Sequence, residues 1–220
     1  MRFPNAAKGL KKIFIAEVLS ILAALLGICM LALMTAIRSV SVVGSGEAVS
    51  AGMQAAGIVI PFLVYRIGTV LLLLVGFFIS IAGIIQASKD EASFRNALWA
   101  ELLGLALSIA AAILQNSGSQ AAGWLSAAST VVSLLVHLLV LDGVCRLAGA
   151  LGKTEIMAMG SRCRIYLLCA MLLSAAGRAI MVLFPGDPDY VSIIGIADFL
   201  MEIGAYVLYL RVLAKAKSMQ

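Results

Sequence analysis

The chain has 220 residues, of which 63% are hydrophobic and only 12% charged, and its mean hydropathy is +1.09. Soluble domains carry about 25% charged residues, so this composition is not that of an ordinary soluble domain. The net charge of +5 does not indicate a nucleic-acid partner, because the basic residues sit beside apolar runs, where they can anchor the chain against anionic headgroups.

Six apolar runs are long enough to cross a membrane, since a transmembrane helix needs about 20 such residues. In chain order the runs are about 13–37, 65–87, 97–114, 122–145, 165–184 and 191–210. The first run is longer than the apolar region of a signal peptide. Short segments separate the third run from the fourth and the fifth from the sixth, which forces antiparallel neighbours. The sequence therefore predicts an all-α integral membrane protein, with residues 1–220 forming one six-helix bundle of three hairpins.

The positive charges predict which side of the membrane each loop occupies. Lys and Arg resist translocation, so the segments that carry them stay inside. The outer loops carry only Arg38. The predicted inner segments, which include a long loop between the fourth and fifth runs, carry Arg2, Lys8, Lys11, Lys12, Lys89, Arg95, Arg146, Lys153, Arg162, Arg164, Arg211, Lys215 and Lys217. We expect both termini to be cytoplasmic, in the inner membrane of a bacterium.

Two further features refine the expected bundle. Trp99, Tyr166 and Tyr209 fall near the inner boundary, the depth that amphipathic aromatic rings favour. Pro61 interrupts the apolar segment 57–88, and proline removes a backbone donor. This segment is therefore expected to be either a short outer helix before Pro61 or one long kinked helix that projects from the membrane.

Small residues recur at every fourth position in the first and third runs: Ala16, Ser20 and Ala24, then Ala100, Gly104 and Ser108. This spacing lets helix backbones approach closely in a membrane. The Ala-rich first run and the six-span size resemble the substrate-binding subunits of energy-coupling-factor vitamin transporters, which use such a helix for docking. That resemblance would imply a partner module with ATPases and a vitamin-like substrate.

Ionisable residues inside a span are costly and are functional candidates by default. Glu17 and Glu101 lie near the inner boundary, and Asp142 is spaced to pair with Arg146, so these acids need no special role. Deeper in the spans, four residues remain as a candidate substrate or ion site: Arg178, Asp198, Glu202 and His137. Arg178 and Asp198 are expected to meet across the hairpin of the last two runs. A buried ion pair that only fixes helix register is an equally open reading.

The sequence holds no motif of zinc, serine or phosphate chemistry, so we expect no enzyme activity, no cofactor and no metal site. The four cysteines read as packing residues. The first hypothesis is a transporter or solute-binding membrane subunit with a polar site in its carboxy-terminal half. The alternative is a non-transporting assembly, immunity or helper subunit that uses the loops 86–96 and 153–159 as contact surfaces. The expected partners are the lipid bilayer and a membrane protein or a second copy of the chain, and no nucleic acid.

Overall fold

The computed structural model describes residues 3–43, 51–115, 120–183 and 188–217, and within them every regular element is an α-helix. The side chains of 30–62, 120, 174–175, 178–200 and 202 lie outside this description. The helices are α1 (Pro4–Val43), α2 (Ala51–Ala87), α3 (Ala92–Gln115), α4 (Gln120–Ala150), α5 (Thr154–Leu183) and α6 (Pro188–Ala216).

Helix length and composition support a membrane-spanning chain. Within the described residues, five segments are long and apolar enough to cross a bilayer: Pro4–Cys29, Leu63–Ala87, Ala92–Gln115, Ala121–Ala150 and Thr154–Leu173. Large apolar side chains also cover their surface, with Phe78, Trp99 and Leu172 each about two-thirds exposed. Exposed apolar surface on this scale is unusual for a soluble monomer. The chain is a multi-span helical protein of membrane type, and the predicted sixth span, 191–210, lies mostly outside the described side chains.

The helices extend well beyond the apolar runs, so several predicted loops are wrong. The α4 helix continues to Ala150 and α5 starts at Thr154, which places Arg146, Arg162 and Arg164 on helices. The intervening turn uses Gly152, whose φ is +69°, a conformation that favours glycine. Of the predicted loop 86–96, only Ser88–Glu91 is not helical. A drop in hydropathy marks the edge of the apolar run, but polar residues can continue the helical hydrogen bonding beyond it.

The structure also decides between the two alternatives for the segment around Pro61, a short helix before the proline or one long helix. The α2 helix includes Pro61 and runs for 37 residues, and α1 runs for 40, so the long-helix alternative is the one found. At 1.5 Å per residue, α1 is about 60 Å long, which is about twice the thickness of the hydrocarbon core of a bilayer.

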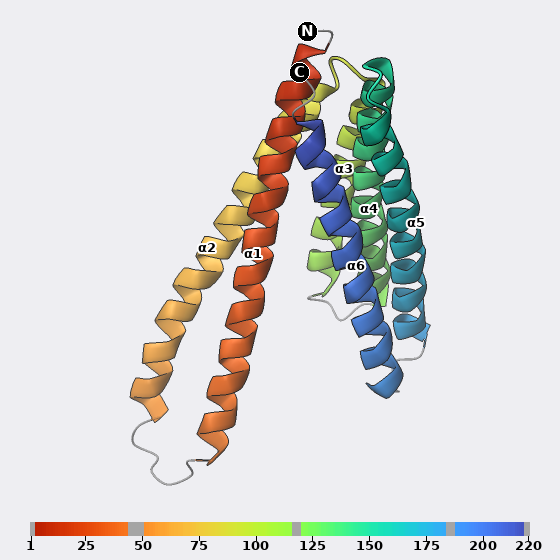
Figure 1. Cartoon of the computed structure of the whole chain (residues 1–220). Coiled ribbons are helices and arrows are strands. Elements are labelled where there is room, and N and C mark those ends of the chain that lie inside the picture. Colours follow the sequence, from red (N-terminus) through yellow and green to blue (C-terminus); the bar gives the residue numbers. More distant parts are fainter. Residues whose placement is uncertain (1–2, 44–50, 116–119, 184–187, 218–220) are drawn as a thin grey trace. The chain divides into compact units, whose positions relative to one another are not determined.

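The chain divides into two compact units, Met1–Phe14 with Ile81–Gln220 and the smaller Ile15–Ser80. The smaller unit is the hairpin of α1 and α2 (Figure 1). A Cβ added to Gly76 of α2 would lie 3.4 Å from the carbonyl oxygen of Ala16 and 3.6 Å from the hydroxyl of Ser20. Two of the small residues of the first predicted run therefore pack against α2, whereas Ala24 is exposed.

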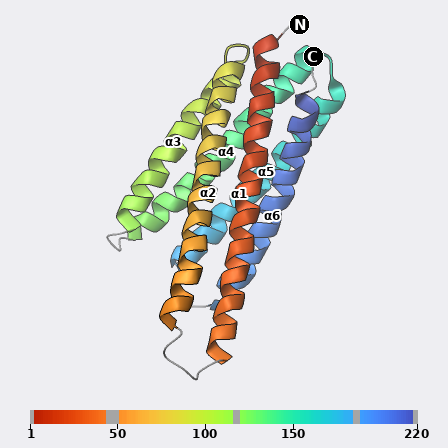
Figure 2. The same ribbon diagram turned by 90° about the vertical axis from the view of Figure 1, so that its left-hand side faces the viewer.

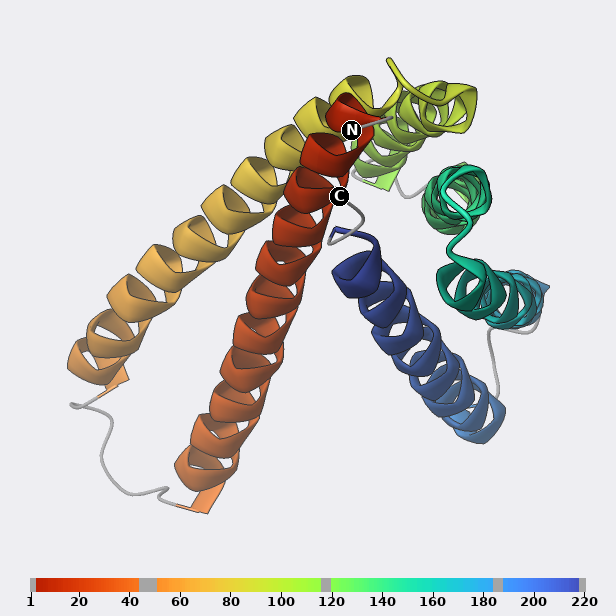
Figure 3. The ribbon, with the colours of Figure 1, turned by 45° about the horizontal axis from the view of Figure 1, so that its top comes forward.

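In the larger unit, α3, α4, α5 and α6 follow one another as spatial neighbours, and α4 and α5 are seen nearly end-on in Figure 3. The start of α1, the α2–α3 and α4–α5 turns and the end of α6 all lie at one end of this unit (Figures 1 and 2). We call it the basic end, because it carries the described basic residues Lys8, Lys11, Lys12, Lys89, Arg95, Arg146, Lys153, Arg162, Arg164, Arg211, Lys215 and Lys217.

The core of the larger unit is concentrated near the basic end. Its largest fully buried side chains are Tyr209, Phe94, Leu10, Ile13, Ile84, Leu141, Leu167 and Leu213. Two glycines permit close approaches in this core. A Cβ on Gly9 of α1 would lie 2.5 Å from the carbonyl oxygen of Gly83 in α2, and one on Gly143 would lie 2.6 Å from the ring of Phe94. Tyr209, predicted to lie near the inner boundary, packs in this core at 1% exposure.

Candidate functional site

A network of charged and polar groups joins α3, α4 and α5 at the basic end. Asp142 of α4 forms ion pairs with Arg146, at 2.8 Å, and with Arg164 of α5, at 2.9 Å. The hydroxyl of Ser93 at the start of α3 lies 3.0 Å from the Asp142 carboxylate. The predicted pairing of Asp142 with Arg146 is confirmed. Asp142 also contacts Ser93 of α3 and Arg164 of α5, so its carboxylate links α4 to both neighbouring helices.

Three other acidic residues at the basic end also have partners within the protein. Asp90, in the α2–α3 turn, accepts hydrogen bonds from the side chain of Asn5 at 3.1 Å and from the backbone N–H of Ala6 at 2.7 Å. It therefore caps the first turn of α1, where a carboxylate also meets the positive end of the helix dipole favourably. Glu155 pairs with Lys215, and Glu91 lies 4.0 Å from Arg146. These contacts organise the basic end and leave it with an excess of positive charge.

His137 is the one predicted site residue whose side chain the structure describes. Its Nδ1 lies 2.8 Å from the backbone carbonyl oxygen of Ser133, so Nδ1 carries the proton and donates it. The imidazole ring packs edge-on against two rings of α6, with centroid distances of 4.8 Å to Tyr209 and 5.8 Å to Tyr206. His137 is half-buried and lies where the packed part of α4 begins, next to the buried Val136.

The other three predicted site residues, Arg178, Asp198 and Glu202, lie outside the described side chains, although their backbones belong to α5 and α6. The predicted meeting of Arg178 with Asp198 therefore stays a prediction. The structure does place the carboxy-terminal part of α6 beside His137, through Tyr206 and Tyr209. The polar site predicted for the carboxy-terminal half of the chain stays a prediction.

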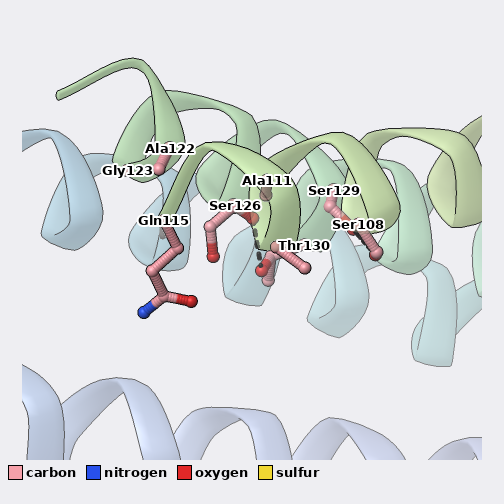
Figure 4. Close-up of a pocket in the computed structure, with 9 residues that line it drawn as sticks. Ser108, Ala111, Gln115, Ala122, Gly123, Ser126, Ser129 and Thr130 are labelled. Atoms are coloured by element: carbon pink, nitrogen blue, oxygen red, sulfur yellow. Dashed lines mark hydrogen bonds between the residues drawn. The ribbon is translucent and has the colours of Figure 1, made fainter. Parts of the chain in front are cut away.

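A groove between α3 and α4 was not predicted. It has a volume of about 550 Å³ and is lined by Ser108, Ala111, Ala112, Gln115, Ala122, Gly123, Ser126, Ser129 and Thr130 (Figure 4). The hydroxyls of Ser108 and Ser129 are 2.6 Å apart, and Ser129 also donates to the carbonyl oxygen of Gly104 at 3.2 Å. Thr130 donates to the carbonyl oxygen of Ser126 at 3.1 Å. The lining therefore combines hydroxyl groups, one amide and small apolar surfaces.

The groove lies where the bundle is least packed. On α3, Ser93, Phe94, Ala97 and Ala100 are buried, but beyond Ala100 only Ala111 is. On α4 none of 121–135 is buried, whereas Val136, Val140, Leu141 and Val144 are. We call the part formed by 104–115 of α3 and 121–135 of α4 the open end. The molecule thus has a dense, charge-clamped basic end and an open end with a polar groove.

The third-run stripe of small residues, Ala100, Gly104 and Ser108, is confirmed as a helix contact face. Ala100 is buried, a Cβ on Gly104 would lie 3.4 Å from a methyl of Val132, and Ser108 meets Ser129. The serines of α4 were missed because single hydroxyls in an apolar run carry little signal by themselves. Their spacing along α4 was the signal that could have found them.

Comparison with known proteins returned no matching family, no matching curated protein and no matching solved structure.

The predicted contact loops of the helper-subunit alternative, 86–96 and 153–159, are largely helical, since only 88–91 and Lys153 of them lie outside α2, α3 and α5.

Proposed function

We propose that this protein is a multi-pass membrane protein that binds a small solute in the groove between α3 and α4, as a transporter or as the solute-binding subunit of one. The observation that carries the proposal is the groove itself. It is of the size of small-molecule sites, which span about 300–1,000 Å³, and it combines polar groups with apolar walls as such sites do.

The placement of the groove supports a binding role over a structural one. A bundle that needed only to be stable would pack along its whole length, because dispersion contacts and close packing hold membrane helices together. Here the residues from Val136 to Ala148 of α4 are mostly buried, and those from Ala121 to Leu135 are not. Such a site would be closed toward the basic end by the core around Tyr209, Phe94 and Leu141.

The positive-inside rule supports an orientation with the basic end in the cytoplasm, so that the groove faces outward. Single cysteines at Ser161, on the basic end, and at Gly123, in the groove, test this orientation in intact cells. An impermeant thiol reagent should label the Gly123→Cys protein at once, and the Ser161→Cys protein only after the membrane is opened. The reverse pattern would invert the protein and would make the groove an inward-facing site.

Solute binding is tested by a screen of neutral, cationic and anionic metabolites on the detergent-purified protein. A ligand that binds only the folded state raises the melting temperature, by a free energy that grows with ligand concentration over Kd. At least one class of solute should give a dose-dependent rise. The site is tested with Ala112→Leu, which fills the groove, and the matched control Ala106→Leu on the same helix.

The two variants separate the groove from the rest of α3. Ala106 lies six residues before Ala112, which places the two on different faces of the helix. Ala112→Leu should abolish the solute response while Ala106→Leu keeps it. A response that survives Ala112→Leu unchanged, or no response to any solute at concentrations up to the millimolar range, would contradict binding in the groove.

A further inference from the structure

The polar groups of α4 form one continuous face. Ser126, Thr130, Ser133 and His137 follow one another at spacings of four, three and four residues, which places them along one side of an α-helix. The first two line the groove, and the last two are joined by the hydrogen bond from His137 Nδ1 to the Ser133 carbonyl oxygen. We call these four residues the α4 polar face. It leads from the mouth of the groove to the aromatic contact of His137 with Tyr206.

The continuation of this face shows which way it points. One turn beyond His137, the same side of α4 carries Val140, Val144 and Ala148, all at 1% exposure or less in the core of the unit. The α4 polar face therefore points to the interior of the bundle and not to lipid. The opposite side of α4 is apolar, with Trp124 and Leu135 exposed at 48% and 39%. The α4 helix thus presents hydroxyl groups to the interior of the bundle and apolar side chains on its opposite side.

Hydroxyl groups facing the interior at the open end need hydrogen-bond partners, because an unsatisfied polar group in an apolar medium is costly. Thr130 and Ser129 satisfy theirs with backbone carbonyl groups. Ser126 and Ser133 are exposed rather than packed. In a membrane-spanning segment such hydroxyls bond either to the preceding helical turn or to water, and their exposure on an interior-facing side gives water access to them.

The chemistry of the lining indicates the class of solute. The nine lining residues of the groove include no ionisable side chain. Hydroxyl groups both donate and accept hydrogen bonds, and the Gln115 amide does the same with separate groups. Such a lining matches a neutral solute with its own donors and acceptors, and it offers no opposite charge to a charged solute.

From this geometry we propose that the α4 polar face lines a water-filled vestibule that ends at His137 and accepts a small neutral solute rich in hydroxyl or amide groups. The proposal rests on the proposed function for its biological meaning and deepens it by naming the solute class. Its physical content is a hydrated path along one side of α4 whose groove lining carries no ionisable side chain, and it can be tested without any ligand.

The test uses single cysteines at Ser126, Thr130 and Ser133 on the α4 polar face, of which the two Ser→Cys changes are near-isosteric. Two controls are Leu135→Cys on the lipid side and Val140→Cys one turn below His137. The background replaces the exposed Cys29 and Cys169 by serine and keeps the buried Cys145 and Cys163, which pack in the larger unit. Reconstituted protein is treated with cationic and anionic methanethiosulfonate reagents, neither of which crosses a bilayer, and each rate is divided by that for free cysteine.

The three face positions should react on the order of tenfold or more faster than Leu135→Cys and Val140→Cys, because only a hydrated thiol ionises and reacts. The cationic and anionic reagents should give similar relative rates, within about threefold, at all three positions. A net charge near the face would separate the two rates by more than about tenfold. Such a separation would overturn the neutral class.

Two other results would overturn the vestibule. One is equal reactivity of Leu135→Cys and the face positions, and the other is no reaction at the face positions from either side of the membrane. Reaction of the face positions only from the basic-end side would also overturn the vestibule, because the core around Tyr209, Phe94 and Leu141 closes that side. If the face positions react but no solute in the screen raises the melting temperature, the proposed function is contradicted while the hydrated path is supported.

Discussion

The two halves of α4 differ in how closely they are packed. From Val136 to Ala148 the helix is packed on its inner side, and Asp142 ties it to both adjacent helices. From Ala121 to Leu135 no residue is buried, and the inner side carries serines and a threonine. Both halves belong to one helix, so the difference follows from their side chains and from how the neighbouring helices meet them. It teaches that packing is concentrated at one end of the helix, which leaves the other end open for the proposed binding.

The largest expected effect comes from the same deletion made in each half. Leu141 is fully buried near the basic end, and Leu135 is 39% exposed at the open end of the same helix. Leu141→Ala should lower the free energy of unfolding by about 2–5 kcal/mol, through lost contacts and a cavity. Leu135→Ala should lower it by less than about 1 kcal/mol, because a lipid-facing leucine leaves no cavity. Unfolding of both variants in the same detergent measures the difference, and equal losses would break the comparison.

Two glycines give the next largest contrast. A Cβ on Gly9 would lie 2.5 Å from the backbone oxygen of Gly83, whereas one on Gly104 would lie 3.4 Å from a flexible methyl of Val132. Gly9→Ala should destabilise the protein by about 1–3 kcal/mol, because backbone has to move. Gly104→Ala should be neutral or stabilise by up to about 1 kcal/mol, since alanine restricts the unfolded chain. Melting temperatures of the two variants check this. A Gly104→Ala loss as large as that of Gly9→Ala would show that the open end is packed as tightly as the basic end.

The smallest contrast concerns polar groups. Asp142→Asn removes the charge that Arg146 and Arg164 contact, and these partly exposed pairs are worth about 1 kcal/mol. Thr130→Val removes only a hydrogen bond to the preceding turn and should change stability by less than about 0.5 kcal/mol. Thermal unfolding at low and high salt distinguishes the two. The Asp142 effect should shrink at high salt, because salt screens exposed charges. An Asp142 effect that salt leaves unchanged would contradict its ionic origin.

Much of this organisation could be predicted from the sequence, since hydropathy and length identify the helices and the spacing of Asp142 and Arg146 predicts their pairing. The exact ends of the helices could not be predicted, because a helix can continue past the edge of an apolar run. Here α4 continues to Ala150 and α5 begins at Thr154. The burial of Tyr209 was missed for a related reason: an aromatic ring near a boundary suits either an interface or a core. The groove was missed because it depends on how α3 and α4 meet, which single hydroxyls in an apolar run do not reveal.

The most direct test of a packed basic end and an open, hydrated end is hydrogen–deuterium exchange along α4 in lipid nanodiscs. Amides in densely packed segments exchange only through large openings, whereas those beside few buried contacts exchange through small ones. Peptides covering 121–135 should therefore exchange faster than peptides covering 138–150 of the same helix. Uniform protection along α4, or faster exchange in 138–150, would contradict the division of the molecule into these two ends.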